Sequence, residues 1–235
     1  MVYRKIRLLM AVLLLASAFF VGRTVSVVVS GGNVEKKEEK GGGRETVVLD
    51  PGHGLGDPGK IGVNQCKEKD INLQIALKVK EKLEAENVEV ILTREEEQAA
   101  LPEDVRNHKA EDMKRRVELI NESEASIAVS IHQNSYPEEE VKGAQVFYFT
   151  HSEEGKKMAE MMQENFRLAN PENHRQAKGN GTYYMLKKTE IPTIIVECGF
   201  LSNWEEAEKL VTPEYQEKTA QIICDGIMKI LQQEM

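Results

Sequence analysis

The sequence predicts a single α/β domain in which helices flank a mainly parallel sheet. Short β-branched runs alternate along the chain with segments whose apolar residues recur every three or four positions, which is typical of this class. The chain has 235 residues, enough for one sizeable core and too few for two large domains. No internal repeat at a fixed period interrupts the pattern.

The first residues are typical of a targeting segment. A basic start with Arg4 and Arg7 precedes an almost wholly apolar run over residues 8–21, and a small-x-small triplet (ASA) occupies residues 16–18. This run is shorter than the ~20 residues that span a bilayer comfortably. We therefore expect residues 1–29 to be a signal peptide or, less in keeping with the pattern, a membrane anchor. Either form implies export across the cytoplasmic membrane.

A flexible linker is predicted over residues 30–44 (SGGNVEKKEEKGGGR), where glycines bracket a run of mixed charge. The folded domain is accordingly expected over residues 45–235. The formal net charge is -8, from 39 acidic and 31 basic residues. This balance argues against nucleic acid as a partner, because phosphate binding requires a basic face.

The first half of the domain reads as strand, loop, helix and strand. Residues 46–50 (TVVLD) form a β-branched run that ends at Pro-Gly, as a buried strand does, and a glycine-rich loop follows over residues 52–62. Residues 70–86 carry apolar side chains four apart, which predicts a helix. Residues 88–92 (VEVIL) predict the next strand.

The second half begins with a polar stretch over residues 95–112, which we expect to be a long loop or a small insertion. Apolar residues at Met113, Val117 and Ile120 then mark a helix. The remaining predicted elements are strands over residues 126–131, 144–149 and 193–196 and helices over residues 152–168 and 213–232.

Four functional side chains lie close to the predicted strand ends. His53 lies three residues beyond the first strand, and His132 and Glu197 each come directly after a strand. Ligands bind α/β sheets beyond the carboxyl ends of the strands. If these strands are parallel and adjacent, the three side chains emerge at one edge. Glu68 ends the loop that starts beside His53, so the loop can return it to the same edge.

Two histidines and one carboxylate suit a catalytic zinc ion, with the fourth position left for water. Zinc can lower the pKa of its bound water to ~7 and can polarise an amide carbonyl. A carboxylate outside this set can take the water proton and pass it to the leaving amine. The sequence therefore favours a zinc ion near His53 and His132, with Glu68 as the candidate third ligand and Glu197 as the candidate catalytic carboxylate.

Each of these residues also has a simpler interpretation. A lone histidine in a loop, such as His53 or His132, is usually solvated. Glu68 could complement the dipole at the start of a helix. Glu197 is the hardest to explain in this way, because it lies in apolar surroundings where an unpaired charge is costly.

At these residues the chain resembles the zinc-dependent N-acetylmuramoyl-L-alanine amidases of the amidase_3 family. The resemblance covers nearly the whole region from residue 46 to the end, and several motifs occur in the family's order. The matching segments are VVLDPGHGLGDPG (47–59), KEKDINLQIA (67–76), VILTR (90–94), SIAVSIHQN (126–134) and PTIIVECGFLSN (192–203).

The resemblance implies roles for the matching positions. His53 of DPGHG, Glu68 of EKD and His132 of SIHQN would be the zinc ligands, and Glu197 of VECGF the catalytic residue. It also implies a single α/β domain with a mainly parallel sheet. The family reaction hydrolyses the amide that joins the lactyl group of N-acetylmuramic acid to L-alanine, so the expected partner is peptidoglycan.

Two further matches have weaker implications. Arg94 follows a strand as in the family and could meet a substrate carboxylate, but a structural ion pair is an equal alternative. Asn134 could form a hydrogen bond near the site or cap a turn. The three cysteines, Cys66, Cys198 and Cys224, cannot all pair internally, and we interpret them as structural thiols.

The chain lacks a recognisable wall-binding repeat, and residues 171–181 offer little room for the long helical plug that gates division amidases. In this it resembles small, exported family members that act on spore-cortex peptidoglycan, where removal of the stem peptide precedes muramic-δ-lactam formation. We therefore expect a role in sporulation and germination, in the cell wall or the spore intermembrane space. A membrane tether or a protein partner would then localise the enzyme.

Two other functions stay open at this point. A zinc peptidase that cuts within the stem peptide would use the same ligands. A metal-binding cell-wall module without activity is also compatible with the motifs, although it would have no need of Glu197.

Overall fold

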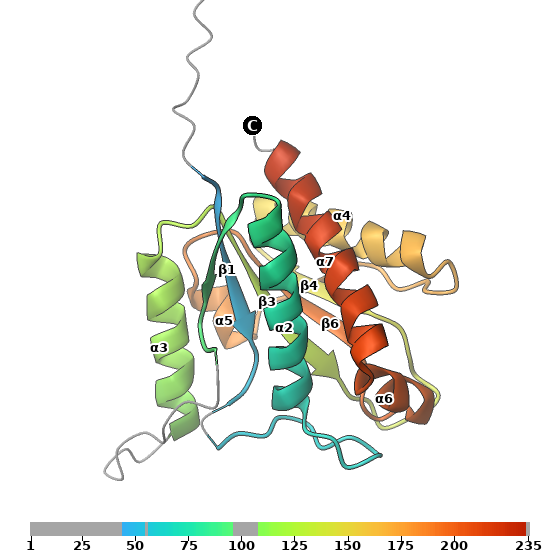
Figure 1. The fold of residues 1–235 in the computed structure, drawn as a ribbon. Helices are drawn as coiled ribbons and strands as arrows, with labels where there is room; N and C mark the ends of the chain where they lie inside the picture. Colours follow the sequence, from blue (N-terminus) through green and yellow to red (C-terminus); the bar gives the residue numbers. More distant parts are fainter. Residues whose placement is uncertain (1–43, 55, 96–107, 234–235) are drawn as a thin grey trace, which may run out of the picture. The chain divides into compact units, whose positions relative to one another are not determined.

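The computed structural model describes residues 44–54, 56–95 and 108–233 (Figure 1). The predicted leader at residues 1–29 and almost all of the predicted linker lie outside these ranges. The described strands form one sheet with the order β2-β1-β3-β6-β4-β5. They are β1 (Thr46–Pro51), β2 (Glu89–Leu92), β3 (Ile127–Asn134), β4 (Gln145–Phe149), β5 (Lys178–Asn180) and β6 (Thr193–Phe200).

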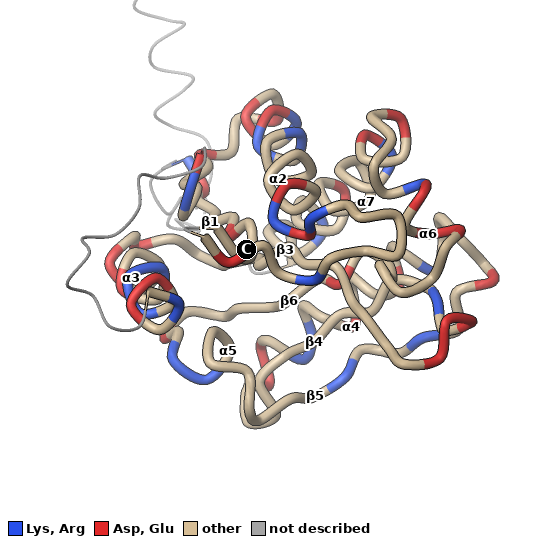
Figure 2. Tube along the Cα trace, turned by 90° about the horizontal axis from the view of Figure 1, so that it is seen from below, with Lys and Arg blue, Asp and Glu red and all other residues tan. Residues whose placement is uncertain are grey.

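Helices cover both faces of this sheet. The described helices are α2 (Glu68–Ala85), α3 (His108–Glu122), α4 (Glu153–Ala169), α5 (Tyr184–Lys188), α6 (Trp204–Leu210) and α7 (Pro213–Gln233). Helices α2, α4 and α7 pack on one face, and α3 and α5 on the other, which Figure 2 shows with the strands seen end-on. Within the described ranges, no helix is long and apolar enough to cross a bilayer. The predicted α/β fold is confirmed.

The central strands are parallel and adjacent, which is the condition for His53, His132 and Glu197 to lie at one edge of the sheet. β1 pairs in parallel with β2 and β3, and β3 pairs in parallel with β6. β4 runs antiparallel to β6, so the sheet is mainly but not wholly parallel. The carboxyl ends of β1, β3 and β6 therefore lie at one edge of the sheet, the lower edge in Figure 1.

Side chains alternate between the two faces along each strand. In β6, Ile194, Val196 and Cys198 belong to the core under α2, α4 and α7, whereas Ile195 belongs to the core under α3 and α5. Glu197 consequently faces the α3/α5 side of the sheet.

A buried ion pair anchors α3 to this second face. Asp50 is fully buried in β1, and its carboxylate accepts hydrogen bonds from Arg116 Nη1 (2.9 Å), Ser130 Oγ (2.6 Å) and Thr93 Oγ1 (2.7 Å). Asp112 Oδ2 lies 3.1 Å from Arg116 Nε without the alignment of a hydrogen bond. These contacts join β1, β3 and α3 directly behind the carboxyl ends of the strands.

The predicted end of the loop over residues 95–112 is wrong, because residues 108–112 already belong to the start of α3. The buried face of these turns carries Asp112 and, one turn later, Arg116. An ion-paired face has no apolar stripe, so hydrophobic periodicity could not detect it. Residues 96–107 lie outside the described ranges.

The sequence also missed three short elements, β5, α5 and α6, each of seven residues or fewer. It ended two strands too early, because β3 continues to Asn134 and β6 to Phe200. His132 and Glu197 therefore lie within their strands and not just beyond them. A polar residue in a β-branched run looks like a strand end, although here Glu197 is buried and His132 half-buried within the sheet.

Replacing Asp50 with Asn should destabilise the fold by about 3–5 kcal/mol, because it leaves the buried Arg116 guanidinium without its charge partner. Urea unfolding monitored by circular dichroism measures the change. Glu118→Gln, which breaks an exposed pair with Lys114 on the same helix, is the matched control and should cost less than about 0.5 kcal/mol.

The Asp50 effect should also depend on pH. Burial alone would raise the pKa of Asp50, but Arg116, Ser130 and Thr93 hold it below its ordinary value. The stability that this carboxylate contributes is thus fully present above the unfolded pKa of about 3.9, and it is lost as pH falls through the lower folded pKa. Equal acid sensitivity of the wild type and Asp50→Asn would contradict this assignment.

Candidate metal centre

A tight loop after β1 turns His53 toward the carboxyl edge of the sheet. His53 has a φ of 65° and Gly54 a φ of 119°, so both residues adopt conformations that are uncommon for L-amino acids. Two backbone hydrogen bonds between Gly54 and Asp57, of 3.0 and 2.8 Å, close the turn. The backbone thus fixes the direction of the His53 ring.

The same loop returns to place Glu68 beside His53. The Glu68 amide donates to Lys60 O at 3.0 Å, and the Lys60 amide donates to Glu68 Oε2 at 2.8 Å. The Gln133 amide, from β3, donates to Glu68 Oε1 at 3.1 Å. Glu68 is 3% exposed. Its carboxylate is therefore in the interior, where these two backbone amides take the place of water as hydrogen-bond donors.

The Glu68 carboxylate lies between two imidazoles. Glu68 Oε2 is 3.1 Å from His53 Nε2, and Glu68 Oε1 is 3.0 Å from His132 Nδ1. One potential ligand atom from each of the three residues lies within 4.8 Å of the others, and no second group of this kind occurs in the described ranges. The structure therefore brings the three predicted ligands together.

The electrostatics of this group favour a cation. Burial alone would raise the pKa of Glu68, but hydrogen bonds from His132 and His53 and the charge of both rings hold it well below its usual range. Burial would lower the pKa of His53, but Glu68 and then Asp57 raise it. An ionised carboxylate between two imidazole nitrogens is a donor set that suits zinc.

Glu197 lies beside this group on the neighbouring strand. Its Cα is paired with that of His132, and its side chain lines the same cavity as the three predicted ligands. Glu197 is 8% exposed, and its Oε2 atom has no hydrogen-bond partner among the described residues. Burial, followed by the negative charge of Glu68, raises the pKa of Glu197 to about 8. Such a carboxyl group can exchange a proton near neutral pH.

The cavity has a volume of about 410 Å³. Asn134 lines it, and the Asn134 Oδ1 atom accepts a hydrogen bond from the Ser135 amide at 2.7 Å. Arg94 does not line it. Its buried guanidinium donates to the carbonyl groups of Pro51, Gly52 and Lys69, which are structural contacts but not the ion pair that the sequence suggested. A substrate contact of Arg94 or Asn134 stays a prediction.

Two residues of the site were not found from the sequence. Asp57 Oδ2 lies 3.0 Å from His53 Nδ1, and a carboxylate four residues after a loop histidine was an available signal. Partial burial would raise the pKa of Asp57, but His53, Lys109 and the Gly59 amide lower it to about 2. Tyr183, at the start of α5, also lines the cavity, and no sequence pattern marks it.

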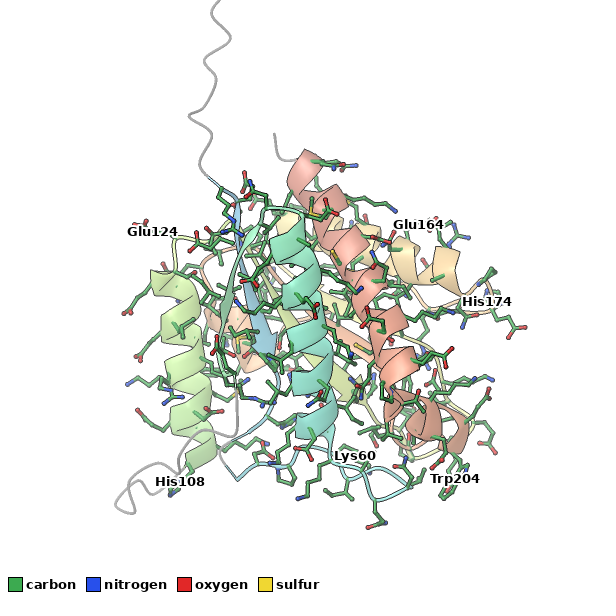
Figure 3. The ribbon with its side chains drawn as sticks, in the orientation of Figure 1. Lys60, His108, Glu124, Glu164, His174 and Trp204 are labelled. Atoms are coloured by element: carbon green, nitrogen blue, oxygen red, sulfur yellow. The ribbon has the colours of Figure 1, made fainter. Side chains whose placement is uncertain are left out.

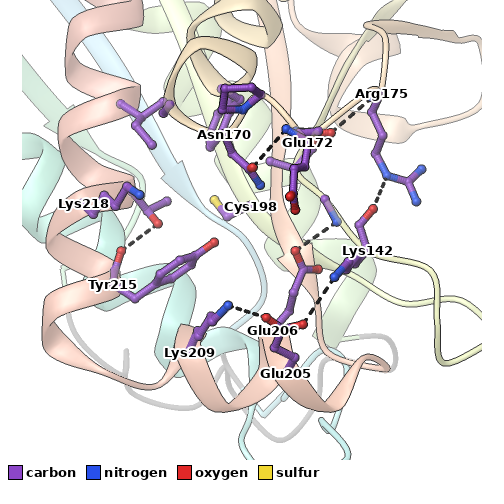
Figure 4. A pocket seen from close by; sticks show the side chains of 18 of the residues that line it. Lys142, Asn170, Glu172, Arg175, Cys198, Glu205, Glu206, Lys209, Tyr215 and Lys218 are labelled. Carbon is purple, nitrogen blue, oxygen red and sulfur yellow. Dashed lines mark hydrogen bonds and ion pairs between the residues drawn. The ribbon is translucent and has the colours of Figure 1, made fainter.

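A larger cavity, of about 640 Å³, lies between α4, α6 and α7 on the other side of β6 (Figure 4). Cys198 contributes to its wall, and Glu205 links Lys142 (3.3 Å) to Lys209 (2.6 Å) at its rim. The described residues that line it do not form a metal-binding group. We therefore place the candidate site in the smaller cavity, because its lining includes the possible metal-binding group.

The remaining histidines and the cysteines lie apart from the ligand group. His151 and His174 are exposed, and Figure 3 shows His174 on the loop after α4 and His108 at the start of α3. Cys66, Cys198 and Cys224 have no disulfide partner. Cys198 and Cys224 belong to the apolar core, which agrees with the interpretation as structural thiols.

Comparison with known proteins identifies similar chains. The sequence profile of the Amidase_3 family, described as N-acetylmuramoyl-L-alanine amidase, matches residues 47–229. The chain is 39% identical over 186 residues to a germination-specific N-acetylmuramoyl-L-alanine amidase of Bacillus subtilis, with 78% of each chain covered.

Solved structures of the same kind share the fold. The CwlD amidase of Clostridioides difficile, solved in complex with the GerS lipoprotein, aligns with a TM-score of 0.77 at 38% identity and covers 80% of this chain and 99% of its own. The catalytic domain of CwlV, an amidase of Bacillus (Paenibacillus) polymyxa var. colistinus, aligns with a TM-score of 0.69 at 31% identity, covering 80% and 98%.

Two glycines of the site loop provide a matched test of the metal centre. At Gly59 (φ +68°) a Cβ atom would lie 2.6 Å from Glu68 Oε2 and 2.7 Å from His53 Cδ2, whereas at Gly56 (φ +89°) it would meet nothing within 4 Å. If His53 and Glu68 bind zinc as predicted, Gly59→Ala should weaken zinc binding roughly tenfold or more, because the new methyl group displaces both side chains at once.

Gly56→Ala is the control. It should cost only the backbone strain of a positive φ, about 1–2 kcal/mol of stability, with zinc affinity unchanged. Competition with a chelating dye measures the affinity. Equal zinc affinity in the two variants would show that the loop does not hold the ligands as described.

Proposed function

The chain belongs to the Amidase_3 family and is an N-acetylmuramoyl-L-alanine amidase acting on peptidoglycan, and on that premise we propose how its site performs the reaction. One zinc ion is held by His53, Glu68 and His132, and Glu197 moves the protons. The observation that carries this proposal is the convergence of four side chains on one cavity. They come from the loop after β1, the start of α2, and strands β3 and β6.

The residues present fit a zinc ion. Two imidazole nitrogens and a buried, ionised carboxylate form the three-ligand set of catalytic zinc sites, with a position left open for water. When bound, zinc supplies an activated water molecule and polarises the carbonyl of the scissile amide.

Glu197 performs the proton transfers. Its carboxylate removes a proton from the attacking water and delivers it to the nitrogen of the leaving L-alanine, so the amine departs uncharged. The raised pKa of this group matches such a dual role, because a carboxyl that titrates near neutral pH can both accept and donate a proton. Its free Oε2 atom is consistent with a group that is not committed to a structural contact.

The bond cut is the amide between the lactyl group of N-acetylmuramic acid and L-alanine, which the family assignment supports. A zinc peptidase would use the same ligands but would cut between amino acids of the stem peptide. A cell-wall module without activity would have no use for a buried Glu197 whose Oε2 atom lacks a hydrogen-bond partner among the described residues.

We further propose that the enzyme matures spore-cortex peptidoglycan. Support comes from the germination-specific relative in Bacillus subtilis and from the similarity to CwlD. Removal of the stem peptide would then precede muramic-δ-lactam formation. The enzyme would be exported to the cell wall or the spore intermembrane space. A membrane tether or a protein partner would localise it, and the complex of CwlD with a lipoprotein supports the partner.

Glu197→Gln should retain zinc and lose cleavage by about 10²–10⁴-fold, because the amide keeps the shape of the side chain but cannot take up a proton. Mass analysis of digested peptidoglycan measures the reaction. The wild type should release peptides that begin with a free L-alanine amino group.

The same experiment separates the alternatives. Fragments that retain L-alanine on muramic acid would identify a peptidase, and no release at all by the zinc-loaded wild type would identify a binding module. His132→Ala is the companion variant and should lose zinc itself. Full zinc occupancy in His132→Ala would contradict the ligand assignment.

The cortex role predicts that spores from a strain without this enzyme lack muramic-δ-lactam. Muropeptide analysis of the cortex measures the lactam, and complementation with the wild type but not with Glu197→Gln should restore it. A normal lactam content in the deletion strain would refute the cortex role while leaving the amidase activity intact.

A further inference from the structure

Each ring nitrogen of His53 faces a carboxylate oxygen. Its Nε2 atom faces Glu68 Oε2 at 3.1 Å, and its Nδ1 atom faces Asp57 Oδ2 at 3.0 Å. The other oxygen of Asp57, Oδ1, accepts a hydrogen bond from the Gly59 amide at 3.1 Å. Lys109, from α3, places its Nζ atom 2.9 Å from Asp57 Oδ2. Asp57 thus has a partner on each oxygen.

The position of Asp57 is set by the backbone. The paired hydrogen bonds between Gly54 and Asp57 close the loop around His53, and the Asp57 side chain caps the next turn through Gly59. The carboxylate is therefore directed at the imidazole before any ligand binds.

We propose that Asp57 is a positioning residue of the metal centre: it keeps the His53 proton on Nδ1, so that the lone pair of Nε2 is directed at the metal ion, and Lys109 braces it from α3. This inference rests on the proposed zinc site and adds to it a residue outside the ligand set.

The chemistry follows from the two nitrogens of imidazole. A neutral ring carries a proton on one nitrogen and a lone pair on the other, and only the lone pair can bind a metal. A carboxylate that accepts the N–H bond selects the tautomer, orients the ring and raises its basicity as a ligand.

His132 has the opposite arrangement. Its Nδ1 atom faces Glu68, and its Nε2 edge lies against Gly52, where an added Cβ would lie 2.2 Å from Nε2. The two histidines would therefore bind the same ion through different nitrogens. Asp57 acts on His53 alone, so its loss should affect one ligand and leave the other in place.

Lys109 contributes less than Asp57 does. The Lys109 side chain is 66% exposed, whereas that of Asp57 is 23% exposed. An exposed ion pair is worth roughly 0–1 kcal/mol. The contact nevertheless joins α3 to the ligand loop, and it holds the one carboxylate oxygen that also meets His53.

The test is the affinity for zinc, measured by competition with a chelating dye. Asp57→Asn should bind zinc about 10–100-fold more weakly than the wild type, because Asn cannot supply a charged acceptor to both Gly59 and His53. Lys109→Met should weaken binding by less than about fivefold. Asp225→Asn, at an exposed position of α7, is the control with the same change of charge and should bind zinc like the wild type.

A second measurement does not depend on the variant folding. In the zinc-loaded wild type, NMR of the histidine ring nitrogens should show the proton of His53 on Nδ1 and that of His132 on Nε2. An Nε2 proton on His53, or wild-type zinc affinity in a folded Asp57→Asn protein, would overturn the inference. Wild-type zinc affinity in His132→Ala would instead refute the metal site itself.

Discussion

The site depends on one buried negative charge, that of Glu68. An ionised carboxylate in the protein interior is costly unless hydrogen bonds and positive partners compensate for it. Here two backbone amides, from Lys60 and Gln133, and the rings of His53 and His132 surround it. These groups come from the loop after β1 and from β3. Holding this charge therefore requires the loop to fold back and β3 to lie in its observed register.

The register of the sheet then determines the rest of the site. The parallel pairing of β3 with β6 sets His132 opposite Glu197, and a shift of one residue would turn either side chain to the other face. On the same face as His132, and two residues before it in β3, Ser130 donates a hydrogen bond to Asp50, which is paired with Arg116 of α3. Helix α3, whose Lys109 contacts Asp57 in the loop after β1, is thus fixed to the same strands by a buried ion pair.

The sequence allowed much of this to be predicted, for definite physical reasons. Strand position and motif order identified His53, Glu68, His132 and Glu197, because parallel strands bring their carboxyl ends to one edge. The same reasoning failed where polar residues are buried. Because Asp112 and Arg116 are polar, the start of α3 was predicted as loop. Because Glu197 is charged, β6 was predicted to end before it. Hydrophobic periodicity registers burial by apolar residues only, so buried polar groups, which mark the site, are also where the predictions were inaccurate.

The two glutamates that line the cavity lie in different environments, and each environment suits the role proposed for that glutamate. Glu68 has partners on both oxygens, and these hold its pKa low, which favours the ionised form that the proposed ligand role requires. Glu197 has no hydrogen-bond partner for Oε2 among the described residues, and burial, followed by the negative charge of Glu68, raises the pKa of Glu197. Environments that separate the pKa values of neighbouring carboxyl groups distinguish an ionised group from one that exchanges protons. The proposed ligand and the proposed acid–base catalyst are therefore coupled, because the charge of Glu68 adds to the effect of burial in raising the pKa of Glu197.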